Sequence, residues 1–306
     1  MIAILGAGAF GAALAHAFEG QIRIWGRGLV PGMTEAPRLP GHPFHANVQV
    51  TAGIDETVEG AQAILLAVPM KALRETLGAI PATQAPLIAC CKGIDPITGL
   101  GPASTIAESR HSPCGILTGP SFAKDIARGL PTALTLAMKD GAETQKRLSS
   151  RTLRLYRTDD IIGAELGGAL KNVLAIASGA VIGSGLGQSA QAALLARGFA
   201  ELARLAVAEG ARRETLMGLS GMGDLMLTAY SQESRNYRYG LALGRGENFA
   251  EDTTVEGVAT AAAVAQLAAR HDLELPVLTT IHRLISGELA ITPAIDALMT
   301  RPLKEE

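Results

Sequence analysis

The sequence predicts an α/β protein in which a doubly wound, largely parallel sheet is followed by an all-α region. Two observations support this prediction. Short apolar runs alternate with helical patterns through the first half of the chain, as in successive strand–helix–strand units. Near residue 160 the strand patterns stop, and alanine-rich helical patterns take their place. We therefore expect an α/β domain over residues 1–160 and a helical domain over residues 161–306.

The first half contains apolar runs with the length and composition of buried strands. A helical pattern, FGAALAHAFEG, joins the first two runs and ends at Gly20. Residues 29–48 form a segment rich in proline and glycine, and loops of this length inside a compact domain are usually functional. The expected strands cover residues 2–6, 21–26, 61–69, 85–93, 114–120 and 130–138.

Lys171 precedes a long uncharged span, and the next charged residue is Arg197. The span is long enough to cross a bilayer. Glycine, serine and glutamine interrupt it, so it is too polar to insert well. We expect a buried central helix, a turn near residues 183–187 and a second helix, with no membrane span. Further alanine-rich helical patterns follow at residues 192–210 and 257–272.

The composition excludes several classes of protein. Of the 306 residues, 48% are hydrophobic and 18% are charged, and the net charge is −2. This balance is typical of a globular protein without general affinity for nucleic acid. The odd number of cysteines, with Cys90 and Cys91 adjacent, is typical of free thiols in a reducing cytoplasm rather than of a disulfide framework. His42 and His45 lie close in sequence without a third ligand nearby, so we expect no metal site.

The motif GAGAFG directly follows the first expected strand and opens a helix. Its glycines, Gly6, Gly8 and Gly11, have the GxGxxG spacing of a Rossmann-type dinucleotide site. The first glycine permits the tight turn, the second lets a pyrophosphate approach the backbone, and the third lets the helix pack on the strand. The helix N-terminus then faces the phosphates. The sequence therefore predicts a bound dinucleotide.

Arg27 follows the second expected strand, where an NAD-preferring site usually places an acidic side chain. An arginine at this position can bind a 2′-phosphate. We therefore expect NADP to be favoured over NAD, although a solvated loop arginine is the alternative interpretation.

Several polar residues lie in settings where polar residues are unusual. Lys171 lies in ELGGALKN, and its expected helix face carries only small residues, Ala164, Gly168, Ala175 and Ser178. Such a stripe leaves room for a backbone or a ligand to approach. Each residue of this kind can also be a surface group or a helix cap, but together they indicate an anion-binding catalytic site. The others are Lys92, Gly119, Ser121, Asp224, Ser234, Arg235 and Asn236.

Seven motifs in order resemble those of the bacterial NAD(P)-dependent glycerol-3-phosphate dehydrogenases. They run from residue 4 to about residue 258 and so cover most of the chain. The set is specific to that family. The motifs are the initial glycine motif, RLPG, GPSFAKDIARGLPTA, ELGGALKNVLAIASG, GMGDLMLT, SRNYRYG and VEGV.

The resemblance implies reduction of dihydroxyacetone phosphate to sn-glycerol 3-phosphate, a phospholipid precursor. It implies that Lys171 is the general acid or base and that Asp224 orients it. It places substrate contacts at Lys92, Gly119, Ser121, Lys171, Asp224, Ser234, Arg235 and Asn236. It places cofactor contacts at Ala9, Phe10, Arg27, Lys92, Ala123, Arg235 and Glu256, besides Gly6, Gly8 and Gly11.

The chain departs from the family pattern at Ala9 and Phe10, where many members have serine or threonine followed by tryptophan. This change removes a hydroxyl near the pyrophosphate but keeps the backbone donors, so it bears on cofactor affinity rather than on chemistry. Two alternatives stay open: a related reductase of ketopantoate or a β-hydroxyacid, and a dinucleotide-binding sensor without turnover. The sequence does not fix the oligomeric state, and a homodimer is one option.

Overall fold

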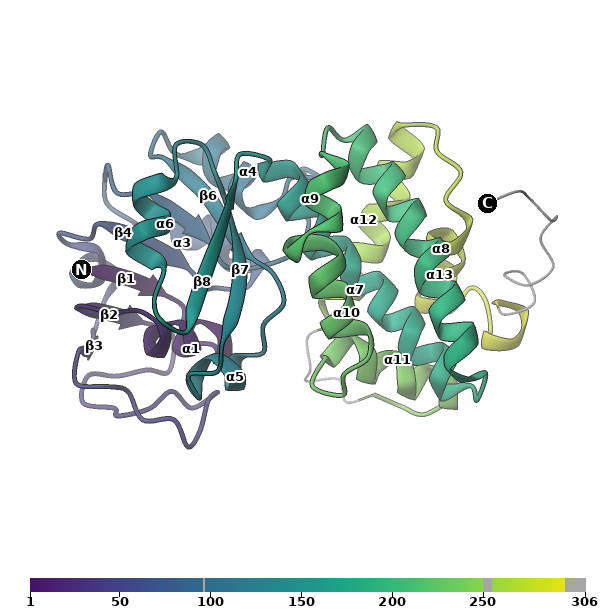
Figure 1. Cartoon of the computed structure of the whole chain (residues 1–306), viewed down its shortest axis with the longest axis horizontal. Helices are drawn as coiled ribbons and strands as arrows, with labels where there is room; N and C mark the ends of the chain where they lie inside the picture. The colour runs from purple at the N-terminus through teal and green to yellow at the C-terminus, as the bar shows by residue number, and fades with distance from the viewer. Residues whose placement is uncertain (96, 250–254, 295–306) are drawn as a thin grey trace.

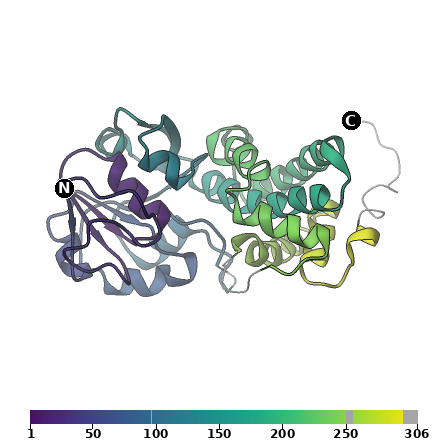
Figure 2. The same ribbon diagram turned by 90° about the horizontal axis from the view of Figure 1, so that it is seen from below.

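The computed structural model describes residues 1–95, 97–249 and 255–294. Two bodies lie side by side along the longest axis of the molecule, one built on a sheet and one built of helices (Figure 1). The view from below shows the same separation (Figure 2). The last strand ends at Thr158 and the first helix of the second body begins at Ile161.

The described residues form one eight-stranded sheet in the order β3-β2-β1-β4-β5-β6-β7-β8. Neighbouring strands are parallel, except that β6 and β7 pair antiparallel. The order reverses beside β1, which pairs with both β2 and β4. Ligands bind such sheets at this switch point, beyond the carboxyl ends of the strands. The strands are β1 Ile2–Leu5, β2 Ile22–Trp25, β3 Val48–Val50, β4 Ala63–Leu66, β5 Leu87–Ala89, β6 Cys114–Thr118, β7 Thr132–Met138 and β8 Leu153–Thr158.

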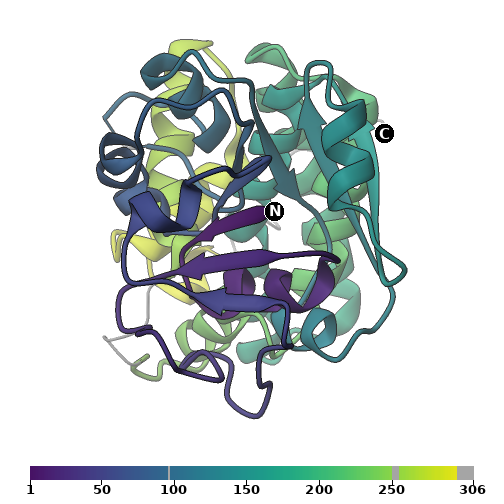
Figure 3. The ribbon, with the colours of Figure 1, turned by 90° about the vertical axis from the view of Figure 1, so that its left-hand side faces the viewer.

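Helices cover both faces of the sheet (Figure 3). Side chains of a strand alternate between the faces, so Ile2 and Ile4 join one core cluster while Ala3 and Leu5 join another. The first cluster includes side chains of α1 (Ala9–Ala17), α5 (Ala123–Ala127) and α6 (Ala142–Leu148). The second includes side chains of α2 (Ile54–Val58), α3 (Met70–Ala79) and α4 (Pro102–Ser109).

The helical body is built around α7 (Ile161–Gly183), whose apolar composition would suit a membrane span. About 83% of its most apolar window is buried inside the protein, as in a core helix of a globular domain. The other helices pack around it (Figures 1 and 2). They are α8 Gly187–Ala208, α9 Arg213–Met217, α10 Asp224–Ala229, α11 Arg235–Arg245, α12 Glu256–Arg270 and α13 Pro276–Ile285, with a π-helical turn, η1, over Leu219–Gly223.

Glycines bring α7 and α11 into backbone contact. A Cβ on Gly240 would lie 2.0 Å from the carbonyl oxygen of Ile176, and one on Gly179 would lie 2.1 Å from that of Tyr237. Only glycine permits so close an approach. The crossing places the N-terminus of α11 beside the middle of α7, where Lys171 lies.

The structure confirms the predicted fold class. The six predicted strands are present, each within the predicted range, and the first helix ends at Ala17 rather than Gly20. The turn between α7 and α8 lies at the predicted place. The edge strands β3 and β8 were not predicted: β3 has only three residues, and β8 alternates buried Leu153 and Leu155 with exposed polar residues, which is a weak strand signal.

Candidate active site

The turn between β1 and α1 needs glycine at two positions for its own folding. Gly6 has φ of +117°, and a Cβ there would lie 2.5 Å from the backbone of Ala67. A Cβ on Gly11 would lie 2.0 Å from the carbonyl oxygen of Gly6. These contacts explain the first and third glycines of the motif.

Gly8 is different, because a Cβ there would meet no described atom within 4 Å. Its φ of −67° is open to any residue, so the fold alone does not require glycine. Among the described residues no side chain caps the N-terminus of α1, whose first residues are Ala9 and Phe10. An open space beside uncapped backbone N–H groups fits a pyrophosphate.

Arg27 lies exposed directly after β2, the strand next to this turn. Within the described chain no carboxylate pairs with it. The guanidinium is therefore open to an anionic ligand.

A cavity of about 130 Å³ lies between the two domains. The sheet domain contributes residues at the ends of β5 and β6, and the helical domain contributes α7, α10, α11 and α12. Eight of the predicted site residues meet there. The lining residues are Lys92, Ser121, Phe122, Lys171, Asn172, Asp224, Thr228, Ser234, Arg235, Asn236 and Glu256.

The other predicted site residues do not line this cavity. Gly119 starts the segment that leads to Ser121, with φ of +140°, and Ala123 is the first residue of α5. The glycine turn follows β1 at the switch point of the sheet, and Arg27 follows the neighbouring strand β2.

Asp224 bridges two lysines at the base of the cavity. Its Oδ1 lies 2.8 Å from Nζ of Lys171, and its Oδ2 lies 2.5 Å from Nζ of Lys92. Lys171 also donates to the hydroxyl of Thr228, which itself lies 3.3 Å from Oδ1 of Asp224. The side chains of Lys171 and Asp224 are buried, with 6% and 3% exposed. The ammonium of Lys171 is thus fixed in direction.

Burial lowers the pKa of Lys171 from its ordinary value to about 8. This value already includes the nearby cation of Lys92, which lowers the pKa, and the carboxylates of Asp224 and Glu256, which raise it. A lysine with a pKa near the working pH can both release and regain a proton, as acid–base catalysis requires.

The N-terminus of α11 forms the opposite wall of the cavity. Ser234 caps it by accepting a hydrogen bond of 3.2 Å from N–H of Tyr237. Asn236 accepts from N–H of Gly257 at 2.9 Å, which fixes its amide. Arg235 is exposed and has no partner among the described residues. A free guanidinium beside a helix N-terminus suits a phosphate.

The charges of the described cavity wall favour an anion. Lys92, Lys171 and Arg235 are cationic, and Asp224 and Glu256 are carboxylates, so three positive and two negative groups leave a net charge of +1.

Three cavity residues were missed by sequence reasoning: Phe122, Asn172 and Thr228. Thr228 follows Asp224 by four residues, so helical spacing would have placed both on one face. Asn172 follows Lys171 but bonds to Glu256, with 3.3 Å between Nδ2 and Oε2. Nothing in the local sequence of Phe122 marks it as a cavity residue.

The segment before Asp224 forms the π-helical turn η1. A Cβ on Gly221 would lie 2.0 Å from the carbonyl oxygen of Leu216, so this turn needs glycine. A Cβ on Gly167 of α7 would lie 2.9 Å from the carbonyl oxygen of Ser220. The small residues of α7 therefore let η1 approach and bring Asp224 to Lys171.

Both domains contribute to one site, as in the two-domain NAD(P)-dependent oxidoreductases, and the chain is of that class. The comparison with known families is more specific. The model of the NAD-dependent glycerol-3-phosphate dehydrogenase N-terminus matches residues 1–144, and that of the C-terminus matches residues 160–296. The chain belongs to the NAD-dependent glycerol-3-phosphate dehydrogenase family.

Relatives match over the whole chain. A glycerol-3-phosphate dehydrogenase [NAD(P)+] of Cereibacter sphaeroides is 55% identical, over 100% of both chains. One of Paracoccus denitrificans is 52% identical, over 100% of this chain and 99% of the other. The crystal structure of glycerol-3-phosphate dehydrogenase from Coxiella burnetii has a TM-score of 0.90 at 34% identity, over 98% of each chain.

A ketopantoate reductase from Ralstonia eutropha shares the fold alone, with a TM-score of 0.59 and 14% identity over 97% of this chain and 99% of that chain. Family membership therefore favours the glycerol-3-phosphate dehydrogenase interpretation over the ketopantoate alternative.

His42 and His45 pack around the ring of His16, with ring centroids 6.4 and 5.2 Å from it. In the described part of the chain no group of three or more histidine, cysteine or acidic side chains is placed to hold a metal ion.

Proposed function

We propose that the protein reduces dihydroxyacetone phosphate to sn-glycerol 3-phosphate with NADPH or NADH, as a step toward glycerophospholipids. One observation carries the proposal: the Lys171–Asp224–Lys92 cluster faces the N-terminus of α11 with its unpaired Arg235 across a small cavity in the described chain. This arrangement offers a proton donor for a ketone and a phosphate site in the same cavity. The names of the close relatives support the same substrate.

When bound at the glycine turn, the dinucleotide supplies the hydride. Lys171 donates a proton to the ketone oxygen as negative charge develops there. Asp224 holds the ammonium in place, and Lys92 favours release of its proton by like-charge repulsion. Thr228 accepts one hydrogen bond of the ammonium and so limits its rotation.

Arg235 binds the substrate phosphate through its planar pair of donors, with Ser234 and Asn236 beside it. Lys92, Gly119 and Ser121 complete the substrate site from the sheet domain.

For the dinucleotide, the backbone of the glycine turn, from Gly6 to Gly11 with Ala9 and Phe10, binds the pyrophosphate. Arg27 binds the 2′-phosphate of NADPH, which is why NADP is favoured over NAD. Lys92, Ala123, Arg235 and Glu256 contact the cofactor near the cavity.

We propose the cytoplasm as the place of action, because all three cysteines lie in the described part of the chain as free thiols, with Cys90 and Cys91 buried. We also propose a domain boundary at residue 160, because the last strand of the sheet, β8, ends at Thr158 and the helix α7 begins at Ile161. The homodimer stays a prediction, which light scattering of the purified protein tests.

The test of the function is oxidation of NADPH and of NADH, each followed with a panel of ketones. Dihydroxyacetone phosphate should be reduced far faster than dihydroxyacetone or ketopantoate, because only the first carries a phosphate for Arg235. Efficient reduction of ketopantoate, or equal rates with dihydroxyacetone and dihydroxyacetone phosphate, would contradict the proposal. Cofactor binding without turnover of any ketone would favour the sensor interpretation.

A further inference from the structure

The segment between β5 and α4 is fastened to both domains. Near its start lies Lys92, whose ammonium pairs with Asp224 of the helical domain. Two residues later Ile94 is buried, with 4% exposed, in the core cluster of the helical domain. Ile94 thus belongs to the sheet domain by its position in the sequence, but it packs in the core of the helical domain.

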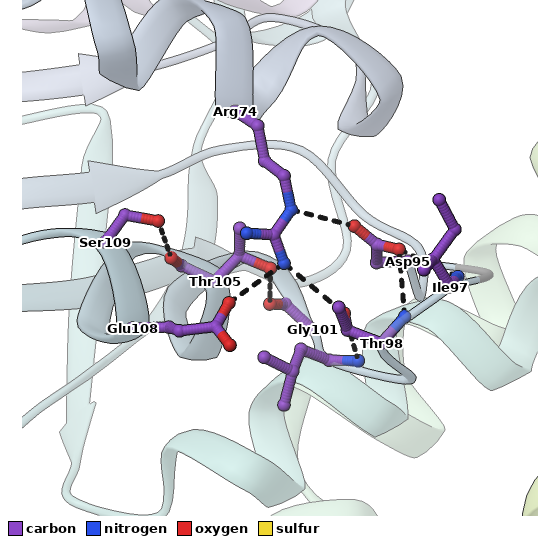
Figure 4. A network of polar contacts seen from close by, with 9 residues as sticks. Arg74, Asp95, Ile97, Thr98, Gly101, Thr105, Glu108 and Ser109 are labelled. Carbon is purple, nitrogen blue, oxygen red and sulfur yellow. Dashed lines mark hydrogen bonds and ion pairs between the residues drawn. The ribbon is translucent and has the colours of Figure 1, made fainter.

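The sheet domain holds the same segment through Arg74 of α3 (Figure 4). Its Nε lies 3.2 Å from Oδ2 of Asp95, and its Nη2 lies 3.0 Å from Oε2 of Glu108 on α4. Asp95 in turn accepts from N–H of Ile97 and of Thr98, at 2.9 and 3.2 Å. Arg74 therefore links Asp95 of this segment to α3 and α4 of the sheet domain.

The N-terminus of α4 is capped by a residue of the other domain. Its N-cap, Gly101, offers no side chain. Glu165 of α7 supplies the acceptors: Oε1 takes N–H of Ala103 and, at 3.0 Å, N–H of Ser104, and Oε2 takes the hydroxyl of Ser104 at 2.7 Å. A Cβ on Gly101 would lie 2.5 Å from Cδ of Glu165, so the carboxylate fills the space that this glycine leaves.

Glu165 is buried, with 4% of the residue exposed. Within the described chain no lysine, arginine or histidine pairs with it, so its charge faces only the hydrogen-bond donors at the start of α4. Burial raises the pKa of Glu165, and the hydrogen bonds from Ser104 and Ala103 act against this rise. A helix N-terminus is a favourable partner for such a carboxylate.

We propose that Glu165 is a positioning residue, which caps α4 across the domain junction and so keeps Lys92 in contact with Asp224. The inference rests on the proposed roles of Lys92 and Lys171. Glu165 lies six residues before Lys171 on the same helix. The helix α7 therefore carries both the proton donor, Lys171, and the carboxylate that keeps Lys92 beside it. The two lysines thus keep a fixed separation.

A second buried carboxylate provides a matched control. Glu201 of α8, also with 4% exposed, caps α13 through N–H of Val277 and Leu278, at distances of 2.8 to 3.0 Å. Both helices that it joins lie in the helical domain. Loss of Glu201 removes a similar cap without a route to Lys92.

The experiment compares Glu165→Ala with Glu201→Ala. Both should lower the melting temperature to a similar extent. Only Glu165→Ala should lower kcat/KM for dihydroxyacetone phosphate, by about 10- to 100-fold, since small misplacement of a catalytic group has effects of this order. Glu165→Gln keeps one acceptor oxygen, which can still accept from N–H of Ala103 and Ser104, and should recover most of the activity. If Glu165→Ala does not fold, Ser104→Ala, which removes the Oε2 contact alone, replaces it with a smaller effect in the same direction.

The pH profile separates positioning from loss of charge. The described groups around Lys171 are Asp224 and Thr228 on α10, Lys92, Glu256 on α12 and Arg235 on α11. If Lys92 moves away, Lys171 loses a cationic neighbour, its pKa rises, and activity persists to higher pH. If the variant acted only by removing a negative charge, the pKa of Lys171 would fall and activity would be lost at lower pH.

Two outcomes would overturn the inference: a folded Glu165→Ala variant with the kcat/KM and pH profile of Glu201→Ala, or a pH profile shifted to lower pH. Failure of the proposed function is seen separately, as absence of turnover by the parent protein. In that case, the pH dependence of Lys171 modification by acetic anhydride, read by peptide mass spectrometry, still reports its pKa. An unchanged profile in Glu165→Ala would then reject the inference.

Discussion

Small residues of α7 make room for the groups that surround Lys171. A Cβ on Gly168 would lie 2.8 Å from Oγ1 of Thr118 and 3.8 Å from the side-chain carbons of Lys92. The absence of that Cβ lets the sheet domain approach α7, while Gly167 lets η1 approach. Of the four small residues predicted to share the face of Lys171, Gly168 thus lies at the contact with the sheet domain, beside Lys92.

The pKa of Lys171, lowered to about 8, predicts a pH dependence. Ketone reduction needs the protonated lysine, so kcat/KM should fall as pH rises through about 8, whereas oxidation of the alcohol, which needs the neutral lysine, should rise. Asp224→Asn removes a charge that raises this pKa, so its fall should come at lower pH. Rate profiles in both directions check this, and an unchanged profile in Asp224→Asn would contradict it.

Arg27 should control cofactor preference. Arg27→Asp reverses the charge beside the expected 2′-phosphate, so preference should shift toward NADH, because the carboxylate repels the phosphate and accepts the ribose hydroxyls. The measurement is kcat/KM for NADPH and NADH in both proteins. An unchanged ratio would leave Arg27 as a solvated loop residue.

Arg235 should bind the substrate phosphate. Arg235→Ala should cost about 2–5 kcal/mol in kcat/KM for dihydroxyacetone phosphate, and Arg235→Lys should recover only part, because an ammonium lacks the planar pair of donors. For dihydroxyacetone, which has no phosphate, kcat/KM should change little in either variant. Arg238→Ala, an exposed arginine of the same helix outside the cavity, is the control. Equal losses for both substrates would leave Arg235 with its cofactor contact alone and would reject the phosphate contact.

At the scale of elements, the crossing of α7 and α11 positions the phosphate site. The sequence predicts α7 but not α11. The glycines of both helices are visible in the sequence with four-residue spacing, Gly179 with Gly183 and Gly240 with Gly244. The sequence does not say which helix pairs with which, because partner choice depends on contacts between distant segments. The same limit applies to Glu165, which looks like an ordinary helix residue until α4 is placed beside it.

Gly240→Ala should destabilise the protein, since its Cβ would lie 2.0 Å from the backbone of Ile176 and α11 would have to move. We expect a loss of about 1–3 kcal/mol, as for other overpacked sites, together with a raised KM for the phosphorylated substrate.

Gly78→Ala is the control for this substitution. Gly78 lies in α3, and a Cβ there would meet no described atom within 4 Å, so alanine should leave stability unchanged or raise it by about 0.5–1 kcal/mol. Thermal unfolding and steady-state kinetics of both variants check the pair. Equal stability of the two would contradict the close packing of α7 and α11.

At the scale of the whole molecule, the sequence predicted most of the residues that form the site, but not the contacts between the domains that bring them together. Eight predicted residues from six separate segments meet in one cavity, because their motifs follow strand ends or open helices. The bridge from Lys92 through Asp224 to Lys171 could not be predicted by spacing, since it joins two domains. The π-helical η1 was also not predictable, because it depends on close contacts with Leu216 and α7.

The central claim is that Lys171, held by Asp224, is the proton donor of a cofactor-dependent ketone reduction. The decisive measurement is kcat together with the Kd of NADPH in a purified, folded Lys171→Ala variant. We predict that kcat falls by about 10²–10⁴-fold while the Kd for NADPH stays close to that of the parent, because the glycine turn and Arg27 lie in the other domain. Turnover near that of the parent would contradict the claim.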